Sequence, residues 1–343
     1  MKAKQISTIL ISVMFSLNAF ALTIGNWQGA PQGDPNVPAG SGKWTDAYWN
    51  KPPVRLPLGP SVSGNEIKII KSGSSCVLDC NVGSYECKLS IGGGADLIAA
   101  PKLEIVNGGS VGMGEIRVGS GGSSANGGFG GLFQTGGTLT LNHKLYIGRF
   151  GTSSTNPNEG KGFYTISGGT LTYAAANSEG GLYVGAAGSD GQAEGTFTVA
   201  GKGGKINVRK LYVGSDGKNA KGTGTLEFEL EPDGVSAINV AEAVLLDASA
   251  DESKAILVVN ADMSAPKTDI VLINIEGANS ATGVFDTING AAAAEGCDVL
   301  LKAGDGDYNY KLTYKGGSGN DIALKYVKLT PKAQAADANA AKK

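Results

Sequence analysis

A short strand motif that ends in glycine recurs along the chain, and it constrains the fold more than any other feature. The copies lie at intervals of 29, 37 and 29 residues: Ile116–Gly119, Leu145–Gly148, Leu182–Gly185 and Leu211–Gly214. Each copy has an apolar residue, then Arg or Tyr, then Val or Ile, then glycine. Self-similarity at a period of roughly 20–50 residues is typical of solenoid proteins. The chain is therefore predicted to stack one structural unit many times.

Each repeat contains two further strand patterns after a loop rich in glycine, serine and asparagine. Residues 195–199 and 205–208 are examples, in which apolar and polar residues alternate. Such alternation predicts strands with one buried face. Three strands per repeat predict a coil whose strands lie parallel to those of the next coil, about 4.8 Å away. A weaker copy lies at 89–92 and 103–109. The predicted fold is all-β: a single-stranded parallel β-helix, or solenoid, with about three short strands per coil.

The glycine content supports this prediction. The chain has 54 glycines in 343 residues, about 16%, against roughly 7% in average proteins. Sharp corners between strands need positive φ angles, which glycine adopts at little cost. The glycines follow no Gly-X-Y period, which excludes collagen, and 41% hydrophobic residues can fill a core, which excludes wholesale disorder.

The first residues are typical of an export signal. Lys2 and Lys4 precede an apolar stretch at 6–20, and Ala19 and Ala21 place small residues at the cleavage positions. This stretch is shorter than the roughly 20 clean apolar residues of a membrane-spanning helix, and no later stretch can span a bilayer. A signal peptide over residues 1–21 is therefore predicted. The mature protein is expected to be secreted, extracellular or on the outer cell surface, with the periplasm as the alternative.

Four segments are predicted after the signal peptide. Residues 22–65 contain all three Trp and seven of the twelve Pro, which predicts an irregular N-terminal cap rather than ladder strands. Residues 66–240 carry the glycine-rich repeats. Residues 241–328, where glycine becomes rarer, are predicted to continue as plainer β-helix coils. Residues 329–343 form an Ala/Lys/Asp/Asn tail that is predicted to be disordered.

Charge and cysteine usage limit the partners and cofactors. The formal charge of −2 becomes −4 without the signal peptide, with 27 basic residues against 31 acidic ones, which disfavours nucleic acid and anionic membranes. An oxidising compartment allows Cys76, Cys80, Cys87 and Cys297 to pair in three possible connectivities. One local disulfide among the first three is expected, with Cys297 buried or paired with the one left over. A zinc site at the three neighbouring cysteines would lack a fourth ligand, because His143 is the only histidine.

The repeats resemble a known group of proteins. The units Leu-Tyr-Val-Gly, Gly-Thr-Phe-Thr-Val and Gly-Gly-Lys-Ile-Asn-Val, the stretch 310–324 and the element 282–285 carry the resemblance, which covers roughly residues 44–327. They are similar to the β-helical passenger repeats of bacterial autotransporter adhesins and to repeat proteins of the PEP-CTERM type. The resemblance implies a right-handed parallel β-helix exported to the cell exterior for adhesion, surface coating or matrix.

Candidates for catalysis or metal binding are few. Glu227, Glu229 and Glu231 alternate along one strand, about 7 Å apart, which is within the range of paired catalytic acids. A solvated outer face opposite Phe228 and Leu230 explains them more simply. His143 is expected at a surface corner, without a nucleophile beside it. Gly316–Asp321 resembles a calcium-binding repeat, but a single copy predicts no calcium site. No catalytic residue, metal or cofactor is therefore expected.

Three tyrosines occupy the same place in consecutive repeats and are the best candidate for a binding site. Tyr146, Tyr183 and Tyr212 are expected to stack as an outward ladder, because the residues beside them are expected to point inward. Such a ladder can bind sugar rings or can only stabilise the sheet. The expected function is that of a non-catalytic structural or adhesive surface protein, in which self-association or surface polysaccharide provides the contacts. A carbohydrate-binding protein that uses the tyrosines is the alternative, and a polysaccharide lyase or hydrolase is less favoured.

Overall fold

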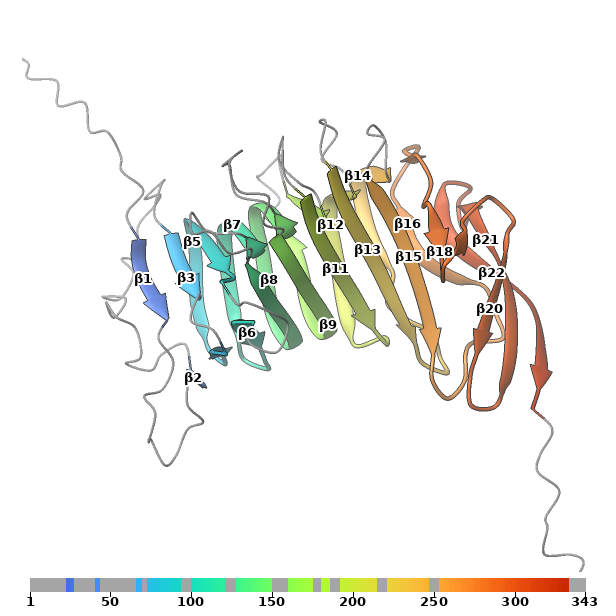
Figure 1. The fold of residues 1–343 in the computed structure, drawn as a ribbon, viewed down its shortest axis with the longest axis horizontal. Helices are drawn as coiled ribbons and strands as arrows, with labels where there is room; N and C mark the ends of the chain where they lie inside the picture. The colour runs from blue at the N-terminus through green and yellow to red at the C-terminus, as the bar shows by residue number, and fades with distance from the viewer. Residues whose placement is uncertain are drawn as a thin grey trace, which may run out of the picture.

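The computed structural model describes residues 23–27, 41–43, 66–69, 73–93, 100–120, 128–149, 160–174, 180–185, 192–214, 221–246 and 253–332. These residues are all-β and contain no helix. Their strands wind into an elongated parallel β-solenoid, with β1 at one end and β20–β22 at the other (Figure 1). The predicted fold class is confirmed. The predicted signal peptide at residues 1–21 lies outside the described residues.

The solenoid has three walls of stacked parallel strands, which we name wall A, wall B and wall C. Wall A contains β1 (Thr23–Trp27), β3 (Glu66–Ile69), the ends of β5 (Asn81–Ile91), β7 (Ser110–Ser120), β8 (Phe129–Arg149), β12 (Gly204–Val213) and β14 (Ile238–Leu246), with β10 (Gly181–Val184) and β17 (Ala281–Thr282). Wall B contains β2 (Ser41–Lys43), β4 (Ser75–Leu78), β6 (Lys102–Ile105), the starts of β8 and β9 (Gly160–Tyr173), β11 (Gln192–Ala200), β13 (Lys221–Leu230), β15 (Lys254–Ala261) and β18 (Thr287–Ile288). Wall C contains the remaining parts of β5, β7, β8, β9, β12 and β14, with β16 (Ile270–Ile275).

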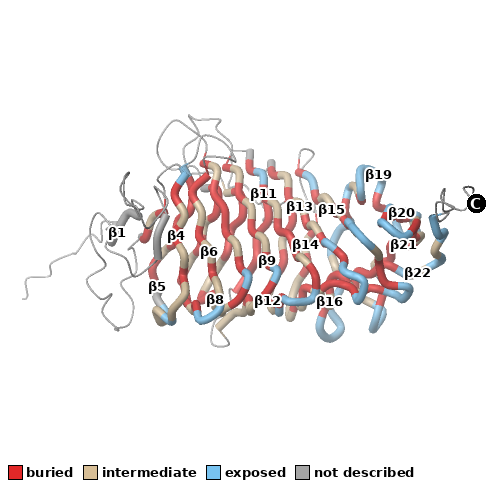
Figure 2. The backbone as a smooth tube through the Cα atoms, turned by 90° about the horizontal axis from the view of Figure 1, so that it is seen from below, coloured by how far each residue is buried: buried red, intermediate tan, exposed pale blue. Residues whose placement is uncertain are grey.

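The recurrent motif sets the register of wall A. Ile116 pairs with Leu145, Leu145 with Leu182 and Leu182 with Leu211, so every copy of the motif lies directly on the next. These leucines and isoleucines are fully buried and belong to one apolar cluster that runs through the coils. Figure 2 shows the buried residues recurring from strand to strand along the rod. A narrow core is thus filled by in-register stacks of branched and aromatic side chains.

The motif glycines make the sharp corner between wall A and wall B. Gly148 has a φ of 68°, and a Cβ atom built on it would lie 1.9 Å from the carbonyl oxygen of Glu194 in β11. The equivalent glycines of the other three copies have φ angles between 63° and 81° and approach a backbone carbonyl in the same way. A side chain at this position is therefore excluded both by backbone conformation and by space.

A buried polar pair interrupts the apolar core. The Tyr164 hydroxyl donates a hydrogen bond to Oε1 of Gln134, and Gln134 Nε2 donates to the carbonyl oxygens of Gly137 at 3.3 Å and Thr170 at 3.0 Å. Both side chains are fully buried, and burial raises the pKa of Tyr164 far above its usual value. Because each polar atom of this pair has a partner, the pair fixes the register of β8 against β9 without an orphaned group.

Both ends of the solenoid differ from the prediction. In the N-terminal segment expected to lack ladder strands, β1 and β2 pair in parallel with β3 and β4 and extend walls A and B. The expected coils over residues 241–328 are corrected as well. The parallel walls reach β17 and β18, and the chain then forms antiparallel strands: β19 (Ala291–Ala292), β20 (Asp298–Lys302), β21 (Gly306–Gly316) and β22 (Asp321–Pro331). Since β22 extends to Pro331, the start of the predicted disordered tail is also corrected.

Three side chains near the C-terminal cap bond to backbone groups of β15 in wall B and of β16 in wall C. Asn289 Oδ1 accepts from the Val259 amide at 2.8 Å, and Asn289 Nδ2 donates to the Val259 carbonyl at 2.9 Å. Asp286 accepts from the Ala255 amide at 2.7 Å, and Asp321 accepts from the Ile275 amide at 2.8 Å. These bonds supplement two strand pairings, of β18 with β15 and of β22, antiparallel, with β16. The edges of the walls are thereby occupied by the chain itself, which protects them from pairing with another chain.

Two glycine substitutions distinguish the effect of a close backbone contact on stability from the effect of backbone strain. Gly148→Ala is expected to destabilise the protein by more than about 3 kcal/mol, since the methyl group must displace the Glu194 carbonyl as well as strain φ. Gly290→Ala is the matched control, because Gly290 has a φ of 82° and nothing within 4 Å of its Cβ position. It is expected to cost about 1–2 kcal/mol. Urea unfolding measures both, and equal losses would contradict the packing role of the motif glycine.

Candidate functional site

The three predicted tyrosines form a ladder on the outer side of wall A. Tyr183 pairs with Tyr146 on one side and with Tyr212 on the other, while the residues beside each tyrosine point into the core. The ring centroids of Tyr146 and Tyr183 are 4.8 Å apart with an interplanar angle of 32°. Those of Tyr183 and Tyr212 are 4.7 Å apart at 3°, a stacked pair. The repeat spacing therefore brings together residues that are 37 and 29 positions apart.

The ladder presents little ring surface to solvent. Only 8% of Tyr146 and 7% of Tyr183 is exposed, and Tyr212 is half-buried. Each tyrosine covers a face of its neighbour, and the guanidinium carbon of Arg149 lies 4.0 Å from the ring centroid of Tyr146. Lys144 Nζ lies 5.9 Å from the ring centroid of Tyr183. Sugar rings would therefore meet the edges of this ladder rather than open aromatic faces. Carbohydrate binding by these residues stays a prediction.

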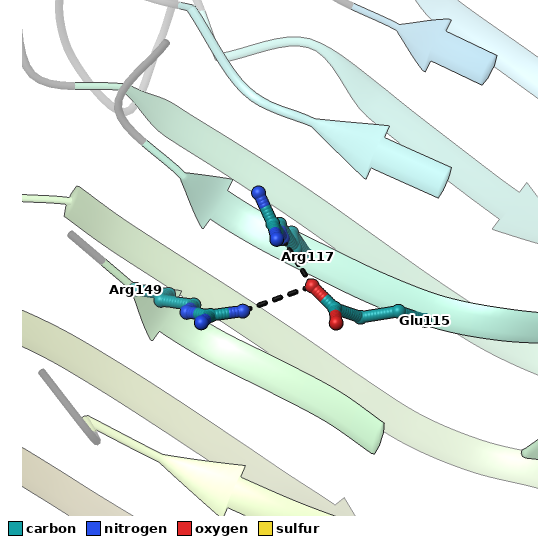
Figure 3. A network of polar contacts seen from close by, with 3 residues as sticks. All are labelled: Glu115, Arg117 and Arg149. Carbon is teal, nitrogen blue, oxygen red and sulfur yellow. Dashed lines mark hydrogen bonds and ion pairs between the residues drawn. The ribbon is translucent and has the colours of Figure 1, made fainter. Parts of the chain in front are cut away.

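Two arginines meet one carboxylate beside the ladder (Figure 3). Arg117 Nε donates to Oε1 of Glu115, and Arg149 Nη1 donates to the same oxygen at 2.9 Å. All three side chains are 21–24% exposed. Burial tends to raise the pKa of Glu115, but the charges of Arg117, Arg149 and Lys88 and the Arg117 hydrogen bond outweigh it. The pKa of Glu115 is held below its usual value, so the carboxylate is ionised at neutral pH.

A second cluster of the same kind lies at the other end of the ladder, in β12 and β14. Arg209 donates to Oε1 of Glu242, and Lys210 Nζ lies 3.7 Å from Oε2 of the same carboxylate. The hydrogen bond from Arg209, and the charges of Arg209 and Lys210, lower the pKa of Glu242. Both clusters thus place two cations on one carboxylate and keep a net positive charge. The sequence pattern showed the arginines and lysines but not that they gather around the tyrosines.

The acidic strand of β13 lies beside a groove on the rim between walls B and C. Phe228 and Leu230 point inward, as expected, and the three glutamates alternate with them. Glu227 accepts hydrogen bonds from Thr198 and Asn260, each at 3.0 Å. Burial, followed by the charge of Glu227, raises the pKa of Glu229.

The groove next to these glutamates has a volume of about 580 Å³. Its lining includes Ser167, Gly201, Glu229, Glu231 and Asp262. Within the ranges that the structure describes, no group of three or more His, Cys, Asp or Glu side chains is placed to hold a metal ion.

The remaining predicted candidates take structural positions. Asn320, in the segment that resembles a calcium-binding repeat, donates to the carbonyls of Ile275, Gly277 and Asn279, at 3.1, 3.0 and 2.6 Å. Asp321 in the same segment accepts from the backbone amide of Ser318 at 3.2 Å, in addition to Ile275. These polar groups join the cap to the last coil. His143 is half-buried in β8, where the chain passes from wall C to wall A.

The four cysteines lie in two places. Cys76 and Cys87 are buried and Cys80 is half-buried, all within the coil that contains β4 and β5. Cys297 precedes β20, and wall B has six further parallel strands between β4 and β18. At about 4.8 Å a strand this separation exceeds 25 Å, whereas a disulfide joins Cα atoms about 4–7 Å apart. Cys297 is therefore out of reach of the other three within one chain, and the local disulfide stays a prediction.

An aromatic cluster that the sequence pattern did not predict lies on the outer side of wall B. The rings of Phe133 and Phe163 meet edge to face, with centroids 5.5 Å apart. Both rings lie over Gly131, where a Cβ atom would come within 2.4 Å of Phe163. Lys102 Nζ lies 5.6 Å from the centre of Phe133. In the sequence of β8, Gly131 lies between the outward residues Phe129 and Phe133. This pattern becomes informative only when the register of β8 against β9 is known.

The comparisons with known proteins leave the family open. The chain has no significant match among protein-family models, curated proteins or solved structures. The described part of the chain also contains no helix long and apolar enough to cross a membrane. The fold and the side-chain geometry therefore carry the functional argument.

Acid is expected to weaken the Glu115 cluster. Because folding lowers the pKa of Glu115, its contribution to stability is complete above the unfolded pKa and is lost as pH falls through the folded one. The stability difference between the native protein and Glu115→Gln should therefore shrink between about pH 6 and about pH 3. Asp298→Asn is the control, because Asp298 is 82% exposed in its pair with Lys311 and should change stability little at either pH. Urea unfolding at both pH values measures this, and a constant difference for Glu115→Gln would contradict the assignment.

Proposed function

We propose that this protein is an exported, non-catalytic structural or adhesive rod of the cell surface. The observation that carries the proposal is the in-register stacking of one strand motif along wall A, over one continuous apolar core. In such an architecture each coil contacts only its neighbours, so length can increase without a new core. The result is a stiff element that presents the same outward positions again and again. The proposed site of action is the extracellular space or the outer cell surface.

The C-terminal end of the rod is closed, which supports a rod of defined length. β22 pairs antiparallel with β16, β19 pairs antiparallel with β18, and Asn289, Asp286 and Asp321 bond to further backbone groups of β15 and β16. Extension by strand pairing at this end is thereby disfavoured. Contacts with a surface or with other copies would therefore use the outer walls. Repeat proteins of autotransporter adhesins and of the PEP-CTERM type, which the sequence resembles, remain the proposed relatives.

A polysaccharide-degrading enzyme is the alternative with the weaker support. A retaining or inverting glycosidase needs one carboxylic acid and one available carboxylate flanking the substrate. Glu229 has the raised pKa of an acid, but Glu227 beside it is engaged by Thr198 and Asn260. The hydrogen bonds of Glu227 to neighbouring coils explain these glutamates as structural residues of wall B.

One experiment separates the rod from the enzyme. The chain that starts at Leu22 is examined by sedimentation velocity and negative-stain electron microscopy, with and without calcium, and is then incubated with a panel of plant and bacterial polysaccharides. The proposal predicts elongated particles and no release of reducing or unsaturated sugars. Sustained release that Glu229→Gln abolishes and Asp298→Asn leaves unchanged would overturn it.

A further inference from the structure

We infer that the outer side of wall A binds an acidic polysaccharide, a linear glycan whose carboxylate or sulfate groups lie along the solenoid axis. The inference rests on the proposed function, because it names the ligand that the exported rod would hold. Two observations support it. Positive charge is segregated on this wall, and the tyrosine ladder lies between the two cationic clusters.

Positive charge is concentrated on wall A in a chain whose net charge is −2. The described charged side chains that point outward from this wall are seven cations and two carboxylates: Lys68, Lys88, Arg117, Lys144, Arg149, Arg209 and Lys210, with Glu115 and Glu242. Lys88, Glu115 and Lys144 occupy one row, since each pairs with the next across consecutive coils, and Lys210 continues that row after Gly181. The lysines of this row lie two strand steps apart, about 10 Å, with Glu115 and Gly181 between them. Cations repeated at a regular spacing match a linear polyanion better than a single small anion.

The arginines of the Glu115 cluster have hydrogen-bonding capacity beyond their carboxylate. Arg117 and Arg149 use one N–H group each on Glu115, out of the five that a guanidinium carries. A planar guanidinium donates in pairs to a carboxylate or a sulfate, which makes arginine the preferred side chain for such groups. The three strand steps from Arg117 in β7 to Arg209 in β12 span about 14 Å along the axis. One glycan chain can therefore reach both clusters.

The ladder between the clusters favours sugar over nucleic acid. Single-stranded nucleic acid binds by stacking bases on open aromatic faces, and the faces of Tyr146 and Tyr183 are covered by each other and by Arg149. Tyr212, at the end of the ladder, is half-buried and is its most exposed member, and a phenolic hydroxyl can donate to or accept from sugar hydroxyl groups. A partly exposed tyrosine beside cations suits a hydrated acidic glycan.

The test measures binding of the chain from Leu22 to polygalacturonate, to dextran sulfate and to uncharged dextran at physiological ionic strength. Lys88→Gln/Lys144→Gln/Lys210→Gln removes three positive charges from wall A. Lys302→Gln/Lys325→Gln/Lys328→Gln removes three from exposed positions of the C-terminal cap and serves as the matched control. Circular dichroism and thermal unfolding verify that both variants fold.

The inference predicts binding to at least one acidic glycan and none to dextran. The affinity should fall about tenfold or more in the wall A variant, and its salt dependence should weaken, while the cap variant keeps the native affinity. The two acidic glycans distinguish carboxylate from sulfate as the recognised group. A second variant, Arg149→Lys, keeps the charge but loses the paired donors and should weaken binding without loss of folding.

Three results would overturn the inference. They are absence of binding to both acidic glycans, an equal loss of affinity in the two lysine variants, and binding to vesicles of phosphatidylglycerol without binding to either glycan. None of these would affect the rod, whose own test is particle shape and the absence of turnover. Failure of the binding site and failure of the proposed function are therefore distinguishable.

Discussion

The close backbone contact at the corner between walls A and B is the constraint on which the other features depend. Each motif glycine turns the chain with a positive φ and lies against a carbonyl of a wall B strand, one coil beyond the wall B strand that the turn leads into, at a distance that excludes any side chain. This contact places successive coils in one register, so that Leu145, Leu182 and Leu211 stack in the core. The same register brings Tyr146, Tyr183 and Tyr212 together outside it. Core and surface are thus two consequences of one repeat.

The repeat made the walls predictable from the sequence, whereas the ends were not. A motif that recurs with an inward leucine and a glycine specifies parallel stacking, because only parallel coils bring identical positions together. In β20 and β21 the alternation of buried and exposed residues is equally clear, but alternation does not indicate strand direction. The antiparallel cap therefore could not be distinguished from further coils. The N-terminal strands were missed because prolines and tryptophans surround them.

The candidate site was predictable in part. Equal spacing showed that the tyrosines would align, and alternation showed that they would point outward. Neither pattern could show that Arg149, which follows the motif, would cover the ring of Tyr146, or that Arg117 and Arg149 would share Glu115. These contacts join residues of different coils, so they depend on side-chain conformations across the register. The surface chemistry of a solenoid is therefore less predictable than its core.

Removal of one whole coil tests the central claim most directly. A deletion of residues 182–210 joins Gly181 to Leu211 and keeps every wall in register, since Leu182 and Leu211 are equivalent positions. A deletion of residues 182–196 instead joins a wall A strand to the middle of a wall B strand. Thermal unfolding followed by circular dichroism should show a cooperative β-sheet transition for the first deletion and none for the second. Loss of folding in both, or in the first alone, would contradict a solenoid built from equivalent coils.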